Sequence, residues 1–185
     1  EGETPDLQWL QENLSGHFEL TVKSLMGPEL HDDKYALLLN RAIPWTELGV
    51  EYEADPRHAE LVIAELGLVG SKPQATAGIK YNKEEIESSP PLSSDIVRTY
   101  RAITARVSFL AQDRIDIAYA SKECCRGMAS PTELHLKMLK RIGRYLVGRK
   151  RLVQLFKFQN QVYSLDVECD SDHAGCAITR RSTSG

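Results

Sequence analysis

The chain has 185 residues, of which 42% are hydrophobic and 26% are charged, so it can hold one good-sized domain or two small ones. No apolar run approaches the roughly 18–20 residues that span a bilayer, which excludes a membrane protein built on such helices. The first residues, EGETPDLQWLQENL, lack the basic and apolar regions of a signal peptide. We therefore expect an intracellular protein, cytoplasmic or nuclear.

The net charge of −3 conceals a strong asymmetry between the two halves of the chain. Residues 1–95 carry 18 acidic and 7 basic side chains, a net charge of −11, whereas residues 96–185 carry 8 acidic and 16 basic side chains, a net charge of +8. The C-terminal half is therefore the half suited to holding a polyanion.

The first part of the chain predicts a small unit of helices and strands. Residues 6–18 place leucines and a phenylalanine on one helical face, which is typical of an amphipathic helix. Three strands, rich in β-branched and aromatic residues, are expected at 18–22, 35–45 and 49–54. The segment 55–67 then predicts a helix that is capped by Asp55 and ended by Gly67.

The second part predicts a linker, three helices and a terminal hairpin. Residues 69–94 collect Gly, Pro, Ser and charged residues without periodicity, as a linker does. The expected helix starts are Ser94 or Asp95, then Asp113, then Ser130-Pro131-Thr132-Glu133, with ends near Gly127 and at Gly148 for the last two. RLVQLFKF (151–158) and QVYSLDVEC (161–169) predict two paired strands. The predicted class is α+β: a small antiparallel sheet with helices, a linker, a three-helix bundle and a C-terminal β-hairpin.

Seven basic residues lie within the fifteen positions 137–151, with no acidic residue among them. They are Lys137, Lys140, Arg141, Arg144, Arg149, Lys150 and Arg151. In the third helix the apolar stripe is Leu134, Met138, Leu139, Ile142, Tyr145 and Leu146, which leaves the basic residues largely on the other side. This pattern suits salt-sensitive contact with phosphates, and a solvated helix face is the alternative interpretation.

The acidic end of the chain is a candidate metal site. A strand that finishes in Asp170-Ser171-Asp172 can hold a carboxylate at a sheet edge, where Mg²⁺ binds through one or two carboxylates. A turn with solvated carboxylates is the alternative, and one such pair does not complete a two-metal site. Cys169, His173 and Cys176 offer three ligands for zinc, although structural zinc sites normally have four.

Taken in order, several blocks make the sequence resemble the copia-type retrotransposon Pol polyprotein, from the reverse transcriptase thumb into RNase H. The blocks are Tyr-Arg, Leu-Ala-x-x-Arg-x-Asp-Ile, Ser-Pro-Thr-Glu and Arg-Tyr-Leu-x-Gly within residues 100–148, then Asp-x-Asp-x-Ala-Gly and Arg-Ser-Thr-Ser-Gly at the end. The N-terminal part also looks like the end of the palm and the primer grip, so the resemblance covers essentially the whole chain.

The resemblance implies a polymerase that copies RNA into DNA and a nuclease that removes the RNA strand, both using paired Mg²⁺ ions on carboxylates. Asp170 matches the first RNase H carboxylate, and Asp172 is its neighbour. The polymerase motif Tyr-x-Asp-Asp does not occur in the chain, and the later RNase H carboxylates would lie downstream. His173 and Ile115 depart from the family pattern, which often has Trp and Pro at these positions.

The resemblance divides the chain into four expected parts: a palm-edge and primer-grip-like unit at 1–68, a linker at 69–94, a helical thumb-like region at 95–150 and the start of an RNase H-like domain at 151–185. The expected function is a catalytically incomplete piece of a reverse transcriptase. It would bind the RNA/DNA template–primer duplex, supply one RNase H metal carboxylate, and associate with the rest of the Pol polyprotein. The alternatives are a non-catalytic nucleic-acid-binding module and an inert pseudogene product.

Overall fold

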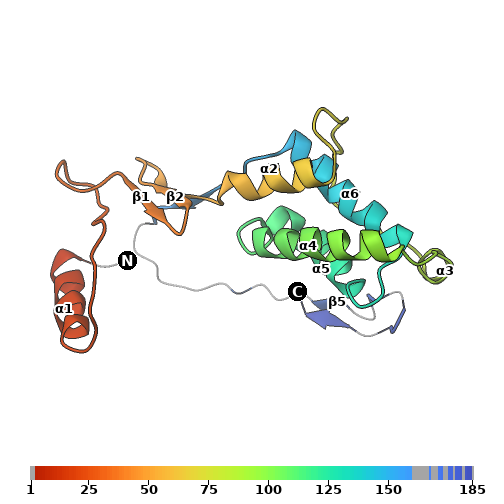
Figure 1. Ribbon diagram of the computed structural model, residues 1–185. Helices are drawn as coiled ribbons and strands as arrows, with labels where there is room; N and C mark the ends of the chain where they lie inside the picture. Colours follow the sequence, from red (N-terminus) through yellow and green to blue (C-terminus); the bar gives the residue numbers. More distant parts are fainter. Residues whose placement is uncertain are drawn as a thin grey trace.

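The computed structural model describes residues 3–159, 167, 171–172, 175–176, 178–180 and 182–184. Within these residues the chain forms a mixed fold of helices and small sheets, which confirms the predicted combination of a small antiparallel sheet with helices. Helix α1 (Thr4–Ser15) lies at one end, the main sheet in the middle and the other helices at the far end (Figure 1). A short antiparallel pair, β5 (Ser171–Asp172) and β6 (Thr183–Ser184), lies beside the helices.

The main sheet has four antiparallel strands in the order β1-β2-β3-β4. Their bounds are Tyr35–Leu38, Arg41–Pro44, Gly49–Glu53 and Val153–Lys157. The prediction of one strand at 35–45 is wrong, because Leu39 and Asn40 form a two-residue turn with φ angles of 50° and 64° that reverses the chain. Positive φ at both central residues is typical of a tight two-residue β-hairpin turn. Asn adopts that conformation readily, whereas Leu gives no signal for it in the sequence.

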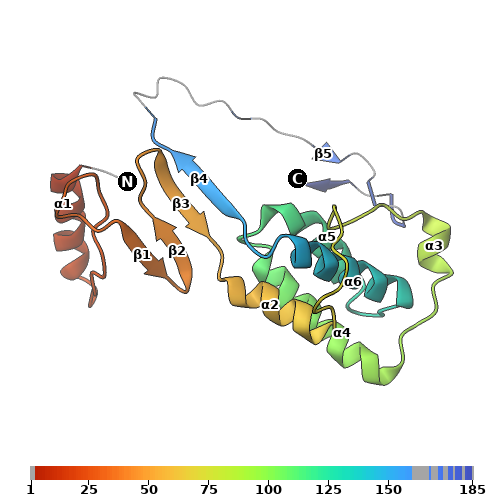
Figure 2. The ribbon, with the colours of Figure 1, turned by 90° about the horizontal axis from the view of Figure 1, so that it is seen from above.

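Strand β4 joins the sheet from the far end of the sequence, as Figure 2 shows. It pairs with β3 over five residues, from Gly49 opposite Lys157 to Glu53 opposite Val153. Its described partner is therefore β3, and the strand predicted at 161–169 lies, apart from Val167, outside the described residues. Glycine is needed at position 49 because a Cβ there would overlap the backbone of Phe156. The first strand of the expected hairpin thus forms and has a long-range partner that was not predicted, while its pairing with 161–169 stays a prediction.

Helix α1 forms close to where its periodicity predicts it, but none of its residues is buried. Trp9, Leu10 and Phe18 are 64%, 47% and 63% exposed. The strand expected at 18–22 is absent, and these residues run on as irregular chain towards Met26, which bridges to Asp33. Helix α1 is therefore amphipathic, but its apolar face is left largely exposed by the described part of the chain.

Four helices enclose the hydrophobic core: α2 (Pro56–Glu65), α4 (Ser94–Leu110), α5 (Ile115–Arg126) and α6 (Glu133–Gly148). The core contains Val62, Tyr100, Ile103, Val107, Ile117, Leu139, Ile142 and Leu146, all nearly inaccessible to solvent. A Cβ at Gly143 would lie 2.5 Å from Leu68 and 2.7 Å from Leu66, so glycine lets α6 approach the end of α2. The predicted helices, the cap at Asp55 and the end at Gly67 are confirmed. The division of the chain into parts at 1–68, 69–94, 95–150 and 151–185 stays a prediction. In the structure α2, from the first of these parts, packs with the helices of the third.

Residues 69–94 lie along this helical unit. The backbone N–H of Gln74 donates to the carbonyl of Arg144 at 3.2 Å, and that of Leu92 donates to the carbonyl of Pro131 at 3.0 Å. Ala77 is buried in the core. A short helix that the composition did not predict, α3 (Lys83–Glu87), starts at a capping box in which Asn82 and Glu85 satisfy each other's backbone N–H groups. We call residues 74–96 the strap, because this segment is fastened along α6.

The start of α5 is built around a fully buried arginine. Arg114 rather than Asp113 is the N-terminal flanking residue of this helix, which corrects the predicted cap. Its guanidinium is 1% exposed, forms a 2.7 Å ion pair with Asp116, and donates to the carbonyls of Arg149 and Lys150 at 3.0 and 3.1 Å. The Tyr145 hydroxyl donates to the same Asp116 carboxylate at 2.9 Å. Arg114 therefore ties the start of α5 to the end of α6.

Acid is expected to weaken this arrangement. Burial acts to raise the pKa of Asp116, but hydrogen bonds from Arg114 and Tyr145 outweigh burial and lower the pKa. The ion pairs with Arg151 and Arg57 likewise lower the pKa of Glu53 and Asp55. Because these folded-state pKa values lie below the unfolded values of about 4, their stabilising contribution is present above about pH 4 and is lost as the pH falls through the folded values.

In urea titrations we therefore expect the free energy of unfolding to decline below about pH 4. Asp116→Asn should be less stable than the parent chain at neutral pH and should show a shallower decline. A parent chain whose stability stays constant down to about pH 2 would contradict the account.

Candidate nucleic-acid interface

Helix α6 has one buried face and one basic face. Leu134, Leu139, Ile142, Tyr145 and Leu146 are buried, as the apolar periodicity predicts, and Met138 is partly buried. The helix starts at Thr132, whose backbone N–H donates to Nδ1 of His135 at 3.1 Å. Burial lowers the pKa of His135, which favours the neutral ring that this contact requires. Lys137, Lys140 and Arg144 are exposed, and Arg141 is half-buried.

These four basic residues line a groove of about 450 Å³ between α6 and the strap. We call it the basic groove. Its other lining residues are Gln74, Ile79, Tyr81, Leu92, Ile96, Glu133 and Leu136. One wall is therefore cationic and comes from α6, while the opposite wall is largely apolar and comes from the strap. Glu133, at the start of α6, is the acidic residue among these lining residues.

Arg141 links the two walls of the basic groove. Its Nη2 atom donates to the Thr76 hydroxyl at 2.8 Å, across to the strap. Its Nε atom is buried and has no hydrogen-bond partner in the part of the chain that the structure describes. A buried donor without a partner is uncommon in proteins, because leaving its hydrogen bond unmade costs roughly 1–3 kcal/mol.

The other three predicted basic residues lie past the end of α6. The guanidinium of Arg149 sits over the ring of Tyr145, 5.8 Å from its centroid. Arg151 forms an ion pair with Glu53 at the end of β3, with Nη2 2.6 Å from Oε2. Lys150 is exposed, and its carbonyl accepts from Arg114. The run of seven is therefore divided into four residues at the groove and three at the junction with the sheet.

The predicted acidic site falls mostly outside what the structure describes. Asp170, Cys169 and His173 lie outside the described residues, and Asp172 is described only as backbone in β5. Among the described side chains no group of three His, Cys, Asp or Glu residues could hold a metal ion. The magnesium site therefore remains a prediction from the sequence.

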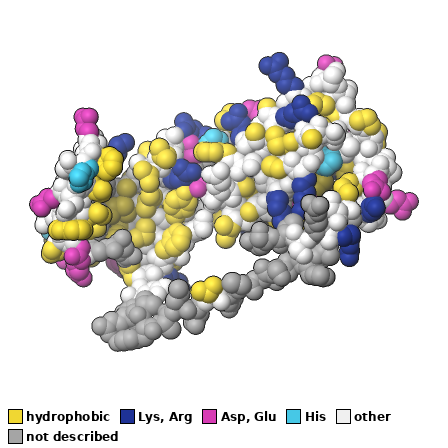
Figure 3. Space-filling model, turned by 90° about the horizontal axis from the view of Figure 1, so that it is seen from below, with side chains coloured by type: hydrophobic (Ala, Val, Ile, Leu, Met, Phe, Trp, Pro, Cys, Tyr) yellow, Lys and Arg dark blue, Asp and Glu magenta, His cyan; other side chains and the backbone are white. Residues whose placement is uncertain are grey.

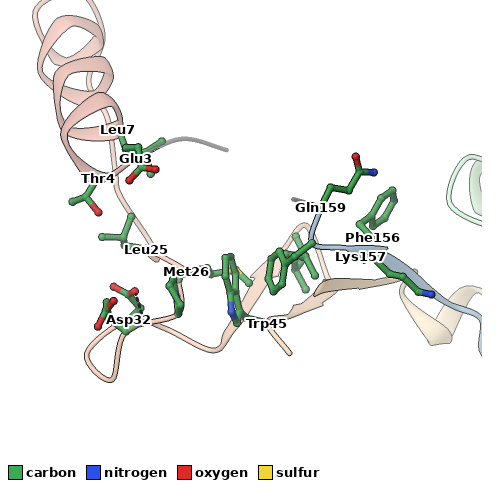
Figure 4. A pocket seen from close by; sticks show the side chains of 16 residues that line it. Glu3, Thr4, Leu7, Leu25, Met26, Asp32, Trp45, Phe156, Lys157 and Gln159 are labelled. Carbon is green, nitrogen blue, oxygen red and sulfur yellow. Dashed lines mark hydrogen bonds between the residues drawn. The ribbon is translucent and has the colours of Figure 1, made fainter. Parts of the chain in front are cut away.

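A larger hollow of about 1050 Å³ lies between α1 and the main sheet, away from the basic groove (Figure 4). Leu7, Leu25, Met26, Trp45 and Phe156 give it a largely apolar lining. Trp45 packs on Phe158 with ring centroids 4.6 Å apart. Glu3, Asp32 and Lys157 are the charged residues at its edge that Figure 4 labels. This hollow offers hydrophobic area and no concentration of positive charge.

Two features of this region are not predicted by the sequence. Tyr81 falls in the predicted linker, and the structure brings it to the basic groove opposite α6. Arg114, Asp116 and Tyr145 were assigned no common role, although they form one buried network. The two-residue spacing of Arg114 and Asp116 gave no signal for an ion pair, because side chains two apart on a helix do not face each other. No local pattern pointed to Tyr81.

The sequence of the chain is similar to retrovirus-related Pol polyproteins of transposons, which confirms the retrotransposon Pol part of the resemblance. The Pol polyproteins from transposons RE1 and RE2 of Arabidopsis thaliana are 32% and 30% identical to the chain, each over 75% of it and 10% of the polyprotein. The uncharacterized mitochondrial protein AtMg00810 of the same plant is 32% identical over 75% of the chain and 59% of that protein. The chain thus spans less than two thirds of each of these relatives.

No protein-family model matches the sequence, and no solved structure gives a significant match. None of the helices in the described part of the chain is both long enough and apolar enough to cross a membrane.

The sequence blocks within residues 100–148 that carried the resemblance build the helical unit. The Tyr100 hydroxyl donates to the carbonyl of Cys124 at 2.6 Å, and Arg101 donates to the carbonyls of Met128 and Ala129 at 2.8 and 2.9 Å. Arg114 and Tyr145, from two further blocks, meet at Asp116. These residues hold the helices together, so the blocks describe a scaffold that presents the basic face of α6.

Proposed function

We propose that the chain is a segment of a copia-type reverse transcriptase polyprotein, and that it holds the RNA/DNA template–primer duplex against the basic face of α6. On this proposal α4, α5 and α6 form a thumb-like unit, and the main sheet is the palm-edge and primer-grip-like part. The observation that carries the proposal is the convergence of Lys137, Lys140, Arg141 and Arg144 on one groove, in a chain similar to transposon Pol polyproteins.

The spacing of these residues fits one strand of a nucleic acid. Lys137 and Arg144 are seven residues apart on α6, which corresponds to about 10 Å of helix axis at about 1.5 Å per residue. A nucleic-acid strand advances about 3.4 Å per nucleotide, so this face would span about three nucleotide steps, which join about four phosphates. Phosphate contacts of this kind position a duplex without reading its sequence.

Asp170 and Asp172 are proposed to contribute metal-binding carboxylates to an RNase H-like site. Carboxylate oxygens suit Mg²⁺, and the ion would assist the attack of water on a phosphodiester. A pair of metal ions needs more carboxylates than these two residues provide. We therefore infer that the chain is catalytically incomplete by itself and depends on other parts of a Pol polyprotein.

The apolar surface around α1 and the sheet supports association with the rest of a Pol polyprotein. Hydrophobic side chains cover much of this end of the molecule in Figure 3. Leu37, Leu38, Leu39 and Phe156 are each more than half exposed. Exposed apolar area on this scale is typical of a surface that meets another protein.

The proposal is tested by binding to a labelled RNA/DNA duplex at several salt concentrations. Four phosphate contacts predict that affinity falls about 100-fold between about 50 and 200 mM salt. Lys137→Gln combined with Lys140→Gln should weaken binding and reduce the slope of log affinity against log salt by about 2.

Two exposed lysines outside the basic groove provide the matched control for this pair. Lys23→Gln combined with Lys157→Gln removes the same charge and should leave the slope close to that of the parent chain. No binding at low salt, or equal effects of the two pairs, would refute the proposal. A non-catalytic nucleic-acid-binding module remains the alternative if the chain binds but never supports a Pol polyprotein's activity.

A further inference from the structure

We propose that the basic groove takes an unpaired nucleic-acid strand, with its phosphates along α6 and a base stacked on Tyr81. This inference rests on the proposed function and adds to it the form of the nucleic acid that enters the groove. It also assigns a role to Tyr81, which neither the sequence blocks nor the run of basic residues includes.

The shape of the basic groove favours a single strand over a duplex. Its volume of about 450 Å³ is that of a site for one small ligand. A duplex, whose major groove alone is about 12 Å wide, can contact the rim of such a groove but cannot enter it. A single strand, or an unpaired end next to a duplex, can place individual bases between the walls.

The two walls differ in the way that single-strand binding requires. Lys137, Lys140 and Arg144 are exposed on the α6 wall and can follow a phosphate backbone. The strap wall presents Ile79, Ile96 and the half-buried ring of Tyr81. Proteins that hold single strands combine a cationic track with aromatic side chains on which bases stack. A surface that contacts only phosphates has no need of an apolar wall.

Arg141 places a further positive charge between the two walls of the basic groove. It lines the same groove as Tyr81; burial raises the pKa of the tyrosine, and the positive charge of Arg141 acts against that rise. Its buried Nε donor is unpaired among the described residues.

The experiment measures binding of a labelled oligothymidylate of roughly 12 nucleotides and of a blunt duplex to the full chain at about 50 mM salt. Tyr81→Ala should weaken oligothymidylate binding by about 5-fold to 100-fold, and Tyr81→Phe should leave it within about 2-fold. Both variants should leave duplex binding within about 2-fold, because the duplex uses the lysines at the rim. Tyr35→Ala, on the exposed strand β1, is the control.

Outcomes for the two proposals are distinguishable. If the variant with Lys137→Gln and Lys140→Gln binds both oligothymidylate and duplex as tightly as the parent chain, the proposed function fails. Only the stacking inference fails if that pair weakens binding but Tyr81→Ala and Tyr81→Phe change oligothymidylate binding by the same factor. It fails alone, too, if Tyr81→Ala weakens oligothymidylate and duplex binding equally. Unfolding of Tyr81→Ala is checked by its thermal midpoint, and Tyr81→Trp, which keeps an aromatic face, must then retain oligothymidylate binding. Tyr81-dependent binding of an acidic amphipathic peptide, without such dependence for oligothymidylate, would assign the groove to a protein segment and overturn the inference.

Discussion

Arg114→Met is expected to lower the free energy of unfolding by about 3–5 kcal/mol, measured by urea denaturation at neutral pH. Methionine keeps much of the volume of the side chain but removes the cation that faces Asp116. The carboxylate would keep the Tyr145 hydroxyl as a donor and lose the buried charge that balances it. The carbonyls of Arg149 and Lys150 would lose their donors as well. A single domain has only about 5–15 kcal/mol of stability, so this variant approaches complete unfolding.

The control is Arg126→Met on the same helix. Arg126 is exposed and forms a 3.3 Å ion pair with Glu123 one turn earlier. Such surface pairs contribute roughly 0–1 kcal/mol, so the control should change stability little. Similar losses from the two variants would show that Arg114 is not the anchor of the helical unit.

A double variant separates the ion pair from the packing. Arg114→Met combined with Asp116→Leu removes both charges, and replacing a whole buried pair by apolar residues is often nearly neutral. We expect the double variant to recover part of the loss seen in Arg114→Met, because no unpaired carboxylate remains. A double variant less stable than the single one would mean that the Asp116 carboxylate stabilises the helical unit through Tyr145 even without the arginine.

How much of the molecule the sequence predicts depends on the range of the contacts. Helices α2, α4 and α6 could be predicted because their apolar residues recur at helical spacing and Asp55 and Gly67 mark the ends of α2. The β1–β2 turn could not, because Leu39 is an unusual residue for positive φ. Strand β4 was recognised as a strand, but its pairing with β3 joins residues about 100 positions apart. Local patterns carry no information about such a partner.

The candidate site shows the same limit. Seven basic residues close in sequence predicted one patch, and the helical period correctly placed those of α6 opposite the buried stripe. Arg151 instead turns to Glu53, 98 residues earlier, because β4 pairs there with β3. The apolar wall of the basic groove comes from the strap, whose composition indicated only a linker. The α6 wall of the basic groove could therefore be predicted from the sequence, whereas the strap wall could not.

The main sheet and the helical unit are held together by a second polar cluster, centred on Asp113. The Asp113 carboxylate accepts from Arg41 Nε of β2 at 2.9 Å and from the Tyr52 hydroxyl of β3 at 2.6 Å. The Asp113 carbonyl accepts from the Gln154 side chain of β4 at 2.9 Å. Three strands thus contact the loop between α4 and α5 through one residue. The hydrogen bond to Asp113 raises the pKa of Arg41, and burial together with its own hydrogen bond to Asp113 raises the pKa of Tyr52.

Asp113→Ala is expected to lower the free energy of unfolding by about 2 kcal/mol, because both donors lose a charged acceptor while partly shielded from water. Its larger effect should be on the placement of the sheet. Limited proteolysis should cut the two connections between sheet and helices, near Asp55 and Arg151, faster than in the parent chain. Asp113→Asn, which keeps an acceptor oxygen for one of the donors, should show an intermediate rate.

A double-mutant cycle between Asp113→Ala and Arg41→Ala then tests whether the two residues act through each other. Arg41 Nε and Asp113 are in direct contact with side chains 17% and 12% exposed, so a coupling of about 0.5–3 kcal/mol is expected. Additive effects, with unchanged cleavage at the two connections, would mean that the β3–β4 pairing and the Glu53–Arg151 ion pair alone set the orientation of the sheet. With coupling present, Asp113 fixes the position of the proposed primer-grip-like sheet relative to the helical unit, and duplex binding should weaken in Asp113→Ala although no basic residue of the groove has changed.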